Sequence, residues 1–273
     1  MEIKRVLVIG GFGYIGKEIV LELIKNNYFV TLLSRKKRSF DNCEVIIDDV
    51  LNKNLILKNF DIIIYLAAVI RSFNKFKYKE NVIGIRNVIE IMNKNNIKKI
   101  IYFSTQNVYL NKTGYYGKSK KEAETILKNS SLDYAIIRPN YVYGVDKENY
   151  FFQIAKFIKK FRFCFVIGYG ENKFQPINKK DVANITLNLL NNFKTCELDL
   201  SGNTISINEI INILKEELKI NVLIFHLPIR LIRIFKFIIP FDVDGFNEDR
   251  VSKQKLKTKF NLRDDLKEII NLI

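Results

Sequence analysis

A glycine-rich turn between a strand-like run and a helix-like run is the feature that most constrains this fold. The apolar run Val6–Ile9 leads into a segment with glycine at every third position, namely Gly10, Gly13 and Gly16. Here the first glycine permits a tight turn, the second lets the backbone approach a pyrophosphate, and the third lets the helix pack closely on the strand. The N–H groups at the helix start then hold the anion. The turn predicts dinucleotide binding by Gly10, Gly13, Tyr14, Ile15 and Gly16, with a ligand-free connection as the alternative.

Strand and helix patterns alternate through the first half of the chain. Strand-length apolar runs lie at Val6–Ile9, Phe29–Leu33, Val45–Ile47, Ile62–Leu66, Ile100–Phe103 and Tyr134–Ile137. Helix-period segments lie between them near Tyr14–Lys25, Phe76–Asn93 and Gly117–Lys128. Near-continuous apolar strands that alternate with helices are typical of a parallel sheet covered on both faces. The pattern predicts an α/β fold with a doubly wound parallel sheet (a Rossmann fold), which binds its ligand at the carboxyl ends of the strands.

The alternation of strand and helix patterns changes after Gly144. A helical pattern near Tyr150–Lys160 leads into Phe163–Gly170, and a helix near Asp181–Asn191 precedes a strand at Glu197–Leu200. We interpret the last two elements as a return to the sheet. Residues 1–145 are therefore expected to form an NAD(P)-binding Rossmann domain, with its sheet completed by about 175–203. Residues 146–174 and 204–273 then form a smaller, mostly helical lobe that binds the substrate.

The net charge of +16 invites a nucleic-acid-binding interpretation, because clustered lysine and arginine form phosphate-binding patches. Lysine is instead abundant from end to end, and no aromatic-studded basic stripe stands out, so we expect no nucleic-acid partner. Cys43, Cys164 and Cys196 lack the spacing of a zinc site or a disulfide framework, so no metal is expected. No apolar run reaches the length of a membrane span, and no leader segment precedes the first strand, which favours a cytoplasmic protein.

The end of the second strand bears on the choice between NAD and NADP. An acidic residue there bonds the adenosine ribose, whereas an arginine accepts a 2′-phosphate. The strand ends in Ser34-Arg35-Lys36-Lys37-Arg38, without a carboxylate. We therefore favour NADP over NAD, with Ser34 and Arg35 near the cofactor; solvated surface charges are the alternative. Asp49 and Val50, after the third strand, are predicted to meet the adenine.

A tyrosine and a lysine four residues apart form the candidate catalytic pair. Tyr116 and Lys120 share one face of a helix, so an ammonium can lie beneath the phenol. A neighbouring positive charge favours the phenolate, so we expect a lowered Tyr116 pKa suited to acid–base chemistry. Thr105 ends the preceding strand, and the loop between them can bring both hydroxyls to one carbonyl. A tyrosine stacked on a lysine stem is the alternative for such a pair.

With these motifs in this order, the chain resembles the short-chain dehydrogenase/reductase superfamily in its extended or atypical branch, the NAD-dependent epimerase/dehydratase family. The matching segments are Val8–Gly16, Asp48–Val50, Asp61–Ala68, Asn81–Gly84, Phe103–Tyr109, Tyr116–Lys120, Arg138–Gly144, Phe174–Ile177 and Asp181–Ala183. The likeness is nearly complete through about residue 215 and weak beyond it. As a set, these motifs are specific for the family and unspecific for the substrate.

The resemblance implies a role for each matched position. Tyr116 is implied as the general acid/base at the substrate oxygen, Lys120 as the group that holds the nicotinamide ribose, and Thr105 as a hydrogen-bonding partner of the same oxygen. Residues implied to lie beside the cofactor or substrate are Leu66, Ala67, Ala68, Arg138, Pro139 and Asn140. The resemblance also implies a homodimer.

The residues around Tyr116 and Lys120 narrow the set of reactions that the site could catalyse. Gln106 follows Thr105 where resembling dehydratases carry an acid, and an amide cannot act as a general acid or base, so dehydration is disfavoured. The interval from Thr105 to Tyr116 is short, and Tyr65 stands where the family usually has histidine. We predict an NAD(P)-dependent reductase or epimerase that acts on a nucleotide-linked sugar by hydride transfer. The alternatives are a non-catalytic cofactor-binding assembly or sensor subunit, and a reductase of a lipid or steroid-like ketone.

One basic apolar segment lies outside the resemblance. Leu227–Ile239 carries three cations, and a basic amphipathic helix can lie on an anionic membrane surface. Such a segment more often caps a substrate cleft or packs on a partner subunit, so membrane contact is the lesser interpretation. His226 is expected to be a packing residue, and Asp242, Asp244 and Glu248 are interpreted as a polar connection.

Overall fold

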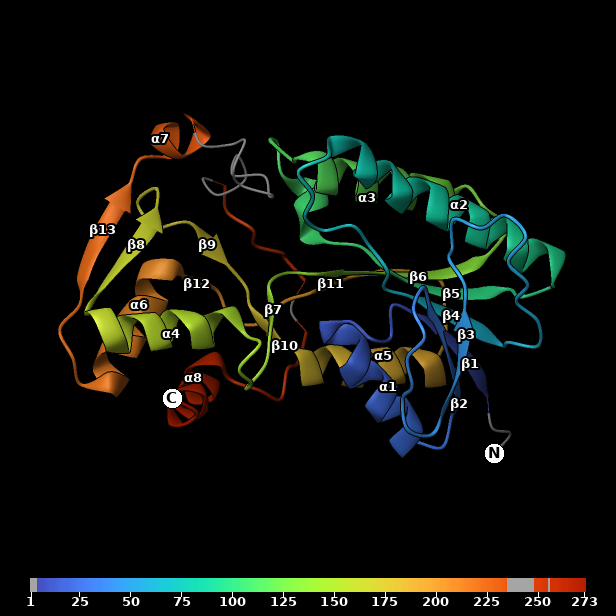
Figure 1. Ribbon diagram of the computed structural model, residues 1–273, viewed down its shortest axis with the longest axis horizontal. Helices are drawn as coiled ribbons and strands as arrows, with labels where there is room; N and C mark the ends of the chain where they lie inside the picture. Colours follow the sequence, from blue (N-terminus) through green and yellow to red (C-terminus); the bar gives the residue numbers. More distant parts are fainter. Residues whose placement is uncertain (1–3, 235–247, 255) are drawn as a thin grey trace.

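The computed structural model describes residues 4–234, 248–254 and 256–273. A large sheet with helices on both faces occupies one end of the molecule, and a smaller, mostly helical lobe occupies the other (Figure 1). We refer to these parts as the large lobe and the small lobe.

The large lobe is built on a seven-stranded parallel sheet in the order β11-β6-β5-β4-β1-β2-β3. Its strands are β1 (Arg5–Ile9), β2 (Phe29–Ser34), β3 (Cys43–Ile47), β4 (Ile62–Tyr65), β5 (Lys99–Phe103), β6 (Asp133–Pro139) and β11 (Cys196–Leu200). The chain runs from β1 outward to β3 and then returns to the other side of β1 with β4, so a crevice opens where the order reverses. The predicted doubly wound parallel sheet is confirmed, and each predicted strand lies within a residue or two of its expected limits.

Helices cover both faces because successive strand residues point to opposite sides of the sheet. Along β1, Val6 and Val8 belong to the core beneath α1 (Tyr14–Lys25) and α5 (Lys179–Asn191). Leu7 and Ile9 belong to the core beneath α2 (Lys79–Lys94) and α3 (Tyr115–Lys128). The predicted helix Phe76–Asn93 begins as a 3₁₀ turn, η1 (Lys75–Tyr78), before α2. Burial on both faces explains why the strands read as continuous apolar runs.

A third hydrophobic core forms the small lobe. Its helices are α4 (Tyr150–Phe161), α6 (Ile207–Leu218), α7 (Ile229–Ile234) and α8 (Leu262–Asn271). Its strands are the parallel pair β8 (Phe163–Ile167) and β13 (Leu223–Leu227), and the short pairs β7 (Val142–Tyr143) with β10 (Ile177–Asn178) and β9 (Lys173–Phe174) with β12 (Ile205–Ser206). β13 was not predicted as a strand within the mostly helical lobe, because a short apolar run has no period that separates strand from helix.

The last part of the chain returns to both lobes. Asp181, buried at the start of α5, accepts hydrogen bonds from the backbone N–H groups of Lys259 and Phe260 (2.9 and 3.2 Å). Asp265 on α8 accepts hydrogen bonds from the Tyr143 hydroxyl and the Asn178 amide (2.8 and 2.9 Å). Segments far apart in the sequence therefore satisfy each other's buried polar groups where the lobes meet.

A buried ion-pair network joins three elements of the large lobe. The Arg138 guanidinium, on β6, donates through Nε and Nη2 to the two carboxylate oxygens of Glu124 on α3 (2.8 and 2.7 Å). It also donates to Glu197 on β11 and, through Nη1, to the Tyr109 hydroxyl (2.8 Å). The expectation that Arg138 borders the nicotinamide is wrong, because these partners direct its side chain into the packing between α3 and the sheet.

Candidate functional site

A cleft of about 1540 Å³ follows the carboxyl ends of the strands and continues along the small lobe. It is lined by Thr105 and by every residue predicted to lie beside the cofactor except Lys120 and Arg138. These residues are Gly10, Gly13, Tyr14, Ile15, Gly16, Ser34, Arg35, Asp49, Val50, Leu66, Ala67, Ala68, Tyr116, Pro139 and Asn140. The structure thus brings together positions that are spread over the first half of the chain, and their roles stay predictions.

The glycine turn has no room for side chains. Gly10 has a φ of +94°, a conformation that favours glycine. A Cβ on Gly16 would lie 2.2 Å from the Gly10 carbonyl oxygen, so α1 packs directly on the turn. Gly13 begins α1 without a side-chain cap, and the first helical turn has no acidic residue. The first N–H groups of α1 can therefore bind a pyrophosphate at the edge of the cleft.

Cations line the cleft where β2 ends. Arg35, Lys36 and Arg38 are part of the lining, and no carboxylate occurs from residue 34 to residue 38. The Arg38 guanidinium lies 5.4 Å from the centroid of the Phe12 ring, which keeps its charge beside the glycine turn. Asp49 lines the cleft too, but its carboxylate accepts a hydrogen bond from the backbone N–H of Leu51 (2.9 Å). The positive charge at this end of the cleft is suited to a phosphorylated ligand.

The predicted catalytic residues come from two neighbouring elements. Thr105 follows β5 and begins the 3₁₀ turn η2 (Gln106–Tyr109), where its Oγ1 accepts a hydrogen bond from the N–H of Asn107 (3.3 Å). Tyr116 lies in the first turn of α3, and both side chains line the cleft. Lys120, one turn further along α3, is buried with its Nζ 4.0 Å from the centroid of the Tyr102 ring. The lysine ammonium therefore lies in the protein interior against Tyr102 and does not line the cleft.

Burial shifts the pKa values of Tyr116 and Lys120 in opposite directions. It raises the pKa of the Tyr116 phenol above its ordinary value and lowers the pKa of Lys120 to about 7. The expectation of a lowered Tyr116 pKa is wrong for this structure, because desolvation disfavours the charged form of either group. Glu124, one turn beyond Lys120, acts in the opposite direction on the lysine pKa and partly offsets its burial.

Gln106 and Asn140 connect the chain segments around the site. The Gln106 Nε2 group donates to the Ser201 hydroxyl (2.7 Å), and its Oε1 accepts a hydrogen bond from the Asn140 amide (2.6 Å). The same Asn140 amide donates to the Arg250 carbonyl (2.7 Å). Both amides line the cleft, yet their hydrogen bonds hold the surrounding backbone in place.

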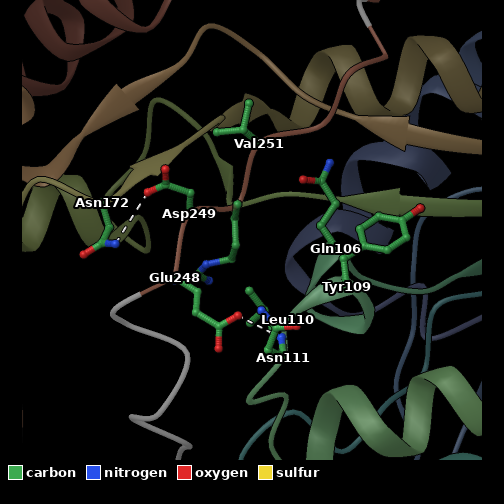
Figure 2. A pocket seen from close by; sticks show the side chains of 9 residues that line it. Gln106, Tyr109, Leu110, Asn111, Asn172, Glu248, Asp249 and Val251 are labelled. Carbon is green, nitrogen blue, oxygen red and sulfur yellow. Dashed lines mark hydrogen bonds between the residues drawn. The ribbon is translucent and has the colours of Figure 1, made fainter.

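Residues 248–252 form a strap across the site that the sequence analysis did not foresee. Figure 2 shows Glu248 beside the loop after η2, where its carboxylate accepts hydrogen bonds from the N–H groups of Asn111 and Lys112 (both 2.8 Å). Arg250 pairs with Phe174 of β9 in a parallel bridge. The strap encloses a side pocket of about 430 Å³ next to Gln106. Glu248 thus joins the strap to the loop after η2, where only a polar connection was expected.

Arg250 is the functional candidate that the sequence analysis missed. Its side chain lines both the cleft and the side pocket. Its Nε is buried without a hydrogen-bond partner among the described residues, and burial lowers the pKa of the guanidinium. An arginine with an unused buried donor is suited to a ligand anion. No motif marks this position, because its neighbours come from distant parts of the chain.

Other expectations concern residues outside the cleft. Within the described ranges, no cluster of histidine, cysteine, aspartate or glutamate could hold a metal, and no helix is long and apolar enough to cross a membrane.

His226 is exposed on β13 with its Nδ1 3.1 Å from the Gly168 carbonyl, so the predicted packing role is wrong. The basic apolar segment is described as far as Ile234, and residues 235–239, Asp242 and Asp244 lie outside the described residues. The homodimer and the cytoplasmic location stay predictions.

Comparisons with known proteins agree with this geometry. A family model described as NAD(P)H-binding matches residues 10–193. A putative UDP-glucose 4-epimerase of Methanocaldococcus jannaschii is 30% identical over 252 residues, which cover 78% of this chain and 82% of that protein. An Escherichia coli O157:H7 protein named N-acetyl-alpha-D-glucosaminyl-diphospho-ditrans,octacis-undecaprenol 4-epimerase is 31% identical over 192 residues, or 62% of this chain and 57% of that protein. The solved UDP-glucose 4-epimerase of Thermotoga maritima with UDP-glucose has a TM-score of 0.80 at 19% identity, covering 98% of this chain and 97% of that one.

The burial of Lys120 predicts a pH-dependent stability. Its folded pKa of about 7 lies below the ordinary value of 10.5, so the unfolded chain binds more protons between these limits and stability rises with pH across them. The slope is at most about 1.4 kcal/mol per pH unit. Urea unfolding from pH 7 to pH 9 should show this rise in the wild type and lose it in Lys120→Met. Lys118→Met, exposed on the same helix, is the control that keeps the rise; equal pH profiles for the wild type and Lys120→Met would contradict the assignment.

Proposed function

The chain belongs to the NAD(P)H-binding family, in the extended branch of the short-chain dehydrogenase/reductase superfamily, and we propose that it is an NAD(P)-dependent 4-epimerase of a nucleotide-linked sugar. One observation carries the proposal: the hydroxyls of Thr105 and Tyr116 line the same cleft as an uncapped glycine turn suited to a dinucleotide. The sequence left reductase and epimerase open. Relatives named as 4-epimerases, including the one from M. jannaschii, favour epimerisation.

The glycine turn fits the cofactor. The first N–H groups of α1 would hold the pyrophosphate, and the close approach of Ala67 to Gly10 leaves the cleft floor without bulky side chains. The chemistry that a bound nicotinamide would supply here is reversible hydride transfer to and from either face of a sugar carbon. The cations after β2 and the uncapped helix start place positive charge where a phosphorylated cofactor would lie.

Tyr116 and Thr105 would manage the proton at the substrate oxygen. Tyr116 takes the proton of the sugar hydroxyl as that carbon is oxidised, and returns it to the keto oxygen when the carbon is reduced. Thr105 hydrogen-bonds the same oxygen and holds it in place. A protonated Lys120 behind the phenol favours its ionised form, which partly opposes the effect of burial. Because the pKa of Lys120 is about 7, this assistance is present at neutral pH and below and is lost as the pH rises.

Tyr116→Phe should remove the proton carrier and leave the shape of the cleft nearly unchanged. We expect kcat to fall at least about 100-fold, the usual contribution of a general acid/base, while dinucleotide binding is retained. The assay follows interconversion of UDP-glucose and its 4-epimer with added NAD or NADP. Tyr115→Phe is the matched control, because this exposed neighbour has no lysine four residues on.

Two outcomes would redirect this proposal. Turnover by Tyr116→Phe at the wild-type rate would exclude Tyr116 as the acid/base. A wild type that binds the dinucleotide but converts no member of a broad panel of nucleotide-linked sugars would favour a cofactor-binding subunit without chemistry.

The cations after β2 support NADP as the preferred cofactor. Arg35 and Arg38 line the cleft, whereas Lys37 does not. Arg35→Ala combined with Arg38→Ala should therefore weaken NADPH binding about 10-fold or more and change NADH binding little, since a charged hydrogen bond contributes about 1.5–3 kcal/mol. Fluorescence titration measures both affinities, with Lys37→Ala as the control. Tighter binding of NADH than of NADPH by the wild type would overturn the preference.

Arg250 is proposed to bind the diphosphate of the substrate. Arg250 lines the cleft, and its Nε is a buried donor with no hydrogen-bond partner among the described residues, which is costly until an acceptor arrives. Arg250→Gln should raise the KM for UDP-glucose about 10-fold or more with a smaller change in kcat, because the diphosphate does not react. Lys253→Gln, exposed just beyond the strap, is the control. An unchanged KM in Arg250→Gln would show that the guanidinium does not contact the substrate.

A further inference from the structure

The small lobe carries an exposed aromatic surface that the proposed chemistry does not use. Phenylalanines from α4, β8 and β13 contact one another with ring centroids 4.7 to 6.1 Å apart. Together with Leu223 they form the aromatic surface: Phe157, Phe161, Phe163, Phe165 and Phe225. Leu223 is 67% exposed, Phe165 58%, and Phe161 and Phe225 each 47%. Large apolar side chains gathered in this way mark an interaction site.

Strand geometry turns these side chains outward. In β8, Cys164 and Val166 are buried in the third core, whereas Phe165 between them faces away from it. Phe225 of β13 is the register partner of Phe165, so the outer face is apolar across both strands. In Figure 1 the two strands lie at the end of the molecule farthest from the seven-stranded sheet. The aromatic surface is therefore presented to whatever lies beyond the small lobe.

The segments that carry the aromatic surface contain cations and no acidic residue. Residues 149–170 and 218–230, which contain all of it, include no aspartate or glutamate. Their exposed cations are Lys156, Lys159, Lys160, Arg162, Lys219 and Arg230. Lys160 lies 5.0 Å from the centroid of the Phe161 ring, so charge and aromatic side chain occupy one patch. Aromatic side chains that enter the headgroup region, beside cations that meet lipid phosphates, are typical of proteins that bind anionic membranes.

The aromatic surface continues into the cleft. Phe157 and Phe165 belong to both, and Ile154, Val166 and Ile167 extend the apolar wall inward. An apolar chain held in the membrane could follow this wall while its polar end reached the strap and the hydroxyls of the site.

We propose that the aromatic surface docks on an anionic membrane and that the cleft takes a sugar joined through a diphosphate to a membrane lipid. The substrate half of this inference rests on the proposed epimerase function, with the lipid diphosphate in place of the nucleotide diphosphate. The E. coli relative, named as an epimerase of a sugar linked through diphosphate to undecaprenol, supports that half. The docking half stands on the aromatic surface and its charge.

Flotation with phospholipid vesicles tests docking. The purified protein should float with vesicles of phosphatidylcholine and phosphatidylglycerol at least about 10-fold more than with phosphatidylcholine alone, and high salt should reduce the difference. Phe161→Ser combined with Phe225→Ser, neither of which lines the cleft, should lower flotation at least about 10-fold. Ile56→Ser combined with Lys58→Glu, on an exposed loop of the large lobe, is the matched control and should float like the wild type.

Activity measurements test the substrate class. The Phe161/Phe225 double variant should epimerise UDP-glucose at the wild-type rate but lose at least about 10-fold in rate on a polyprenyl-diphosphate-linked sugar presented in anionic vesicles. Equal rates of the two proteins on the vesicle substrate would overturn the inference. If the wild type converts no sugar at all, the proposed function fails, while flotation still decides docking by itself.

Two further results bear on what the aromatic surface binds. No flotation of the wild type would overturn docking. A stable dimer in light scattering that the Phe161/Phe225 double variant dissociates, without wild-type flotation, would show that a second copy of the chain covers this face.

Discussion

The backbone distance between α1 and the turn before it sets the position of the whole cleft. A single carbon on Gly16 would lie 2.2 Å from the Gly10 carbonyl oxygen, so α1 can begin directly at the end of β1 only because both positions lack side chains. Leu66 and Ala67 lie beside the same turn, since both of their N–H groups donate to the Ile9 carbonyl (2.8 and 3.0 Å). The floor of the cleft and its anion-binding end therefore result from backbone packing, and the reactive side chains are added at its edge.

Polar side chains then join that edge to the strap. The Tyr109 hydroxyl receives a hydrogen bond from Arg138 and donates one to Asp199 (2.8 and 2.9 Å). Asp199 in turn accepts a hydrogen bond from the Ser252 hydroxyl of the strap (2.7 Å). The buried ion pair beneath α3 is thus continuous with the segment that carries Arg250. These hydrogen bonds connect the ion pair to the ligand-binding face, although the two lie on different elements.

The fold of the large lobe could be predicted because the patterns that indicate it lie in short stretches of the sequence. The inner strands of the sheet are buried on both faces and read as apolar runs, and the glycine turn, Thr105 and Tyr116 lie in short contiguous motifs. Arg250 could not be predicted, because its importance depends on a bridge to Phe174 and an unpaired donor, both of which require the folded chain. The direction of the Tyr116 pKa was also beyond the sequence. A four-residue spacing predicts that Lys120 lies near the phenol, but only the structure shows that burial raises the pKa of Tyr116 and lowers that of Lys120.

Asp181 and Asn178 form hydrogen bonds with residues that come much later in the chain. This order affects how the chain can fold during its synthesis. α5 covers one face of the sheet, yet the buried carboxylate at its first turn is satisfied by backbone groups of residues 259 and 260. During translation, that face therefore cannot reach its final packing until those residues have left the ribosome. We expect this face of the nascent chain to remain incompletely packed, and its folding not to be fully cooperative, until residues 259 and 260 have emerged.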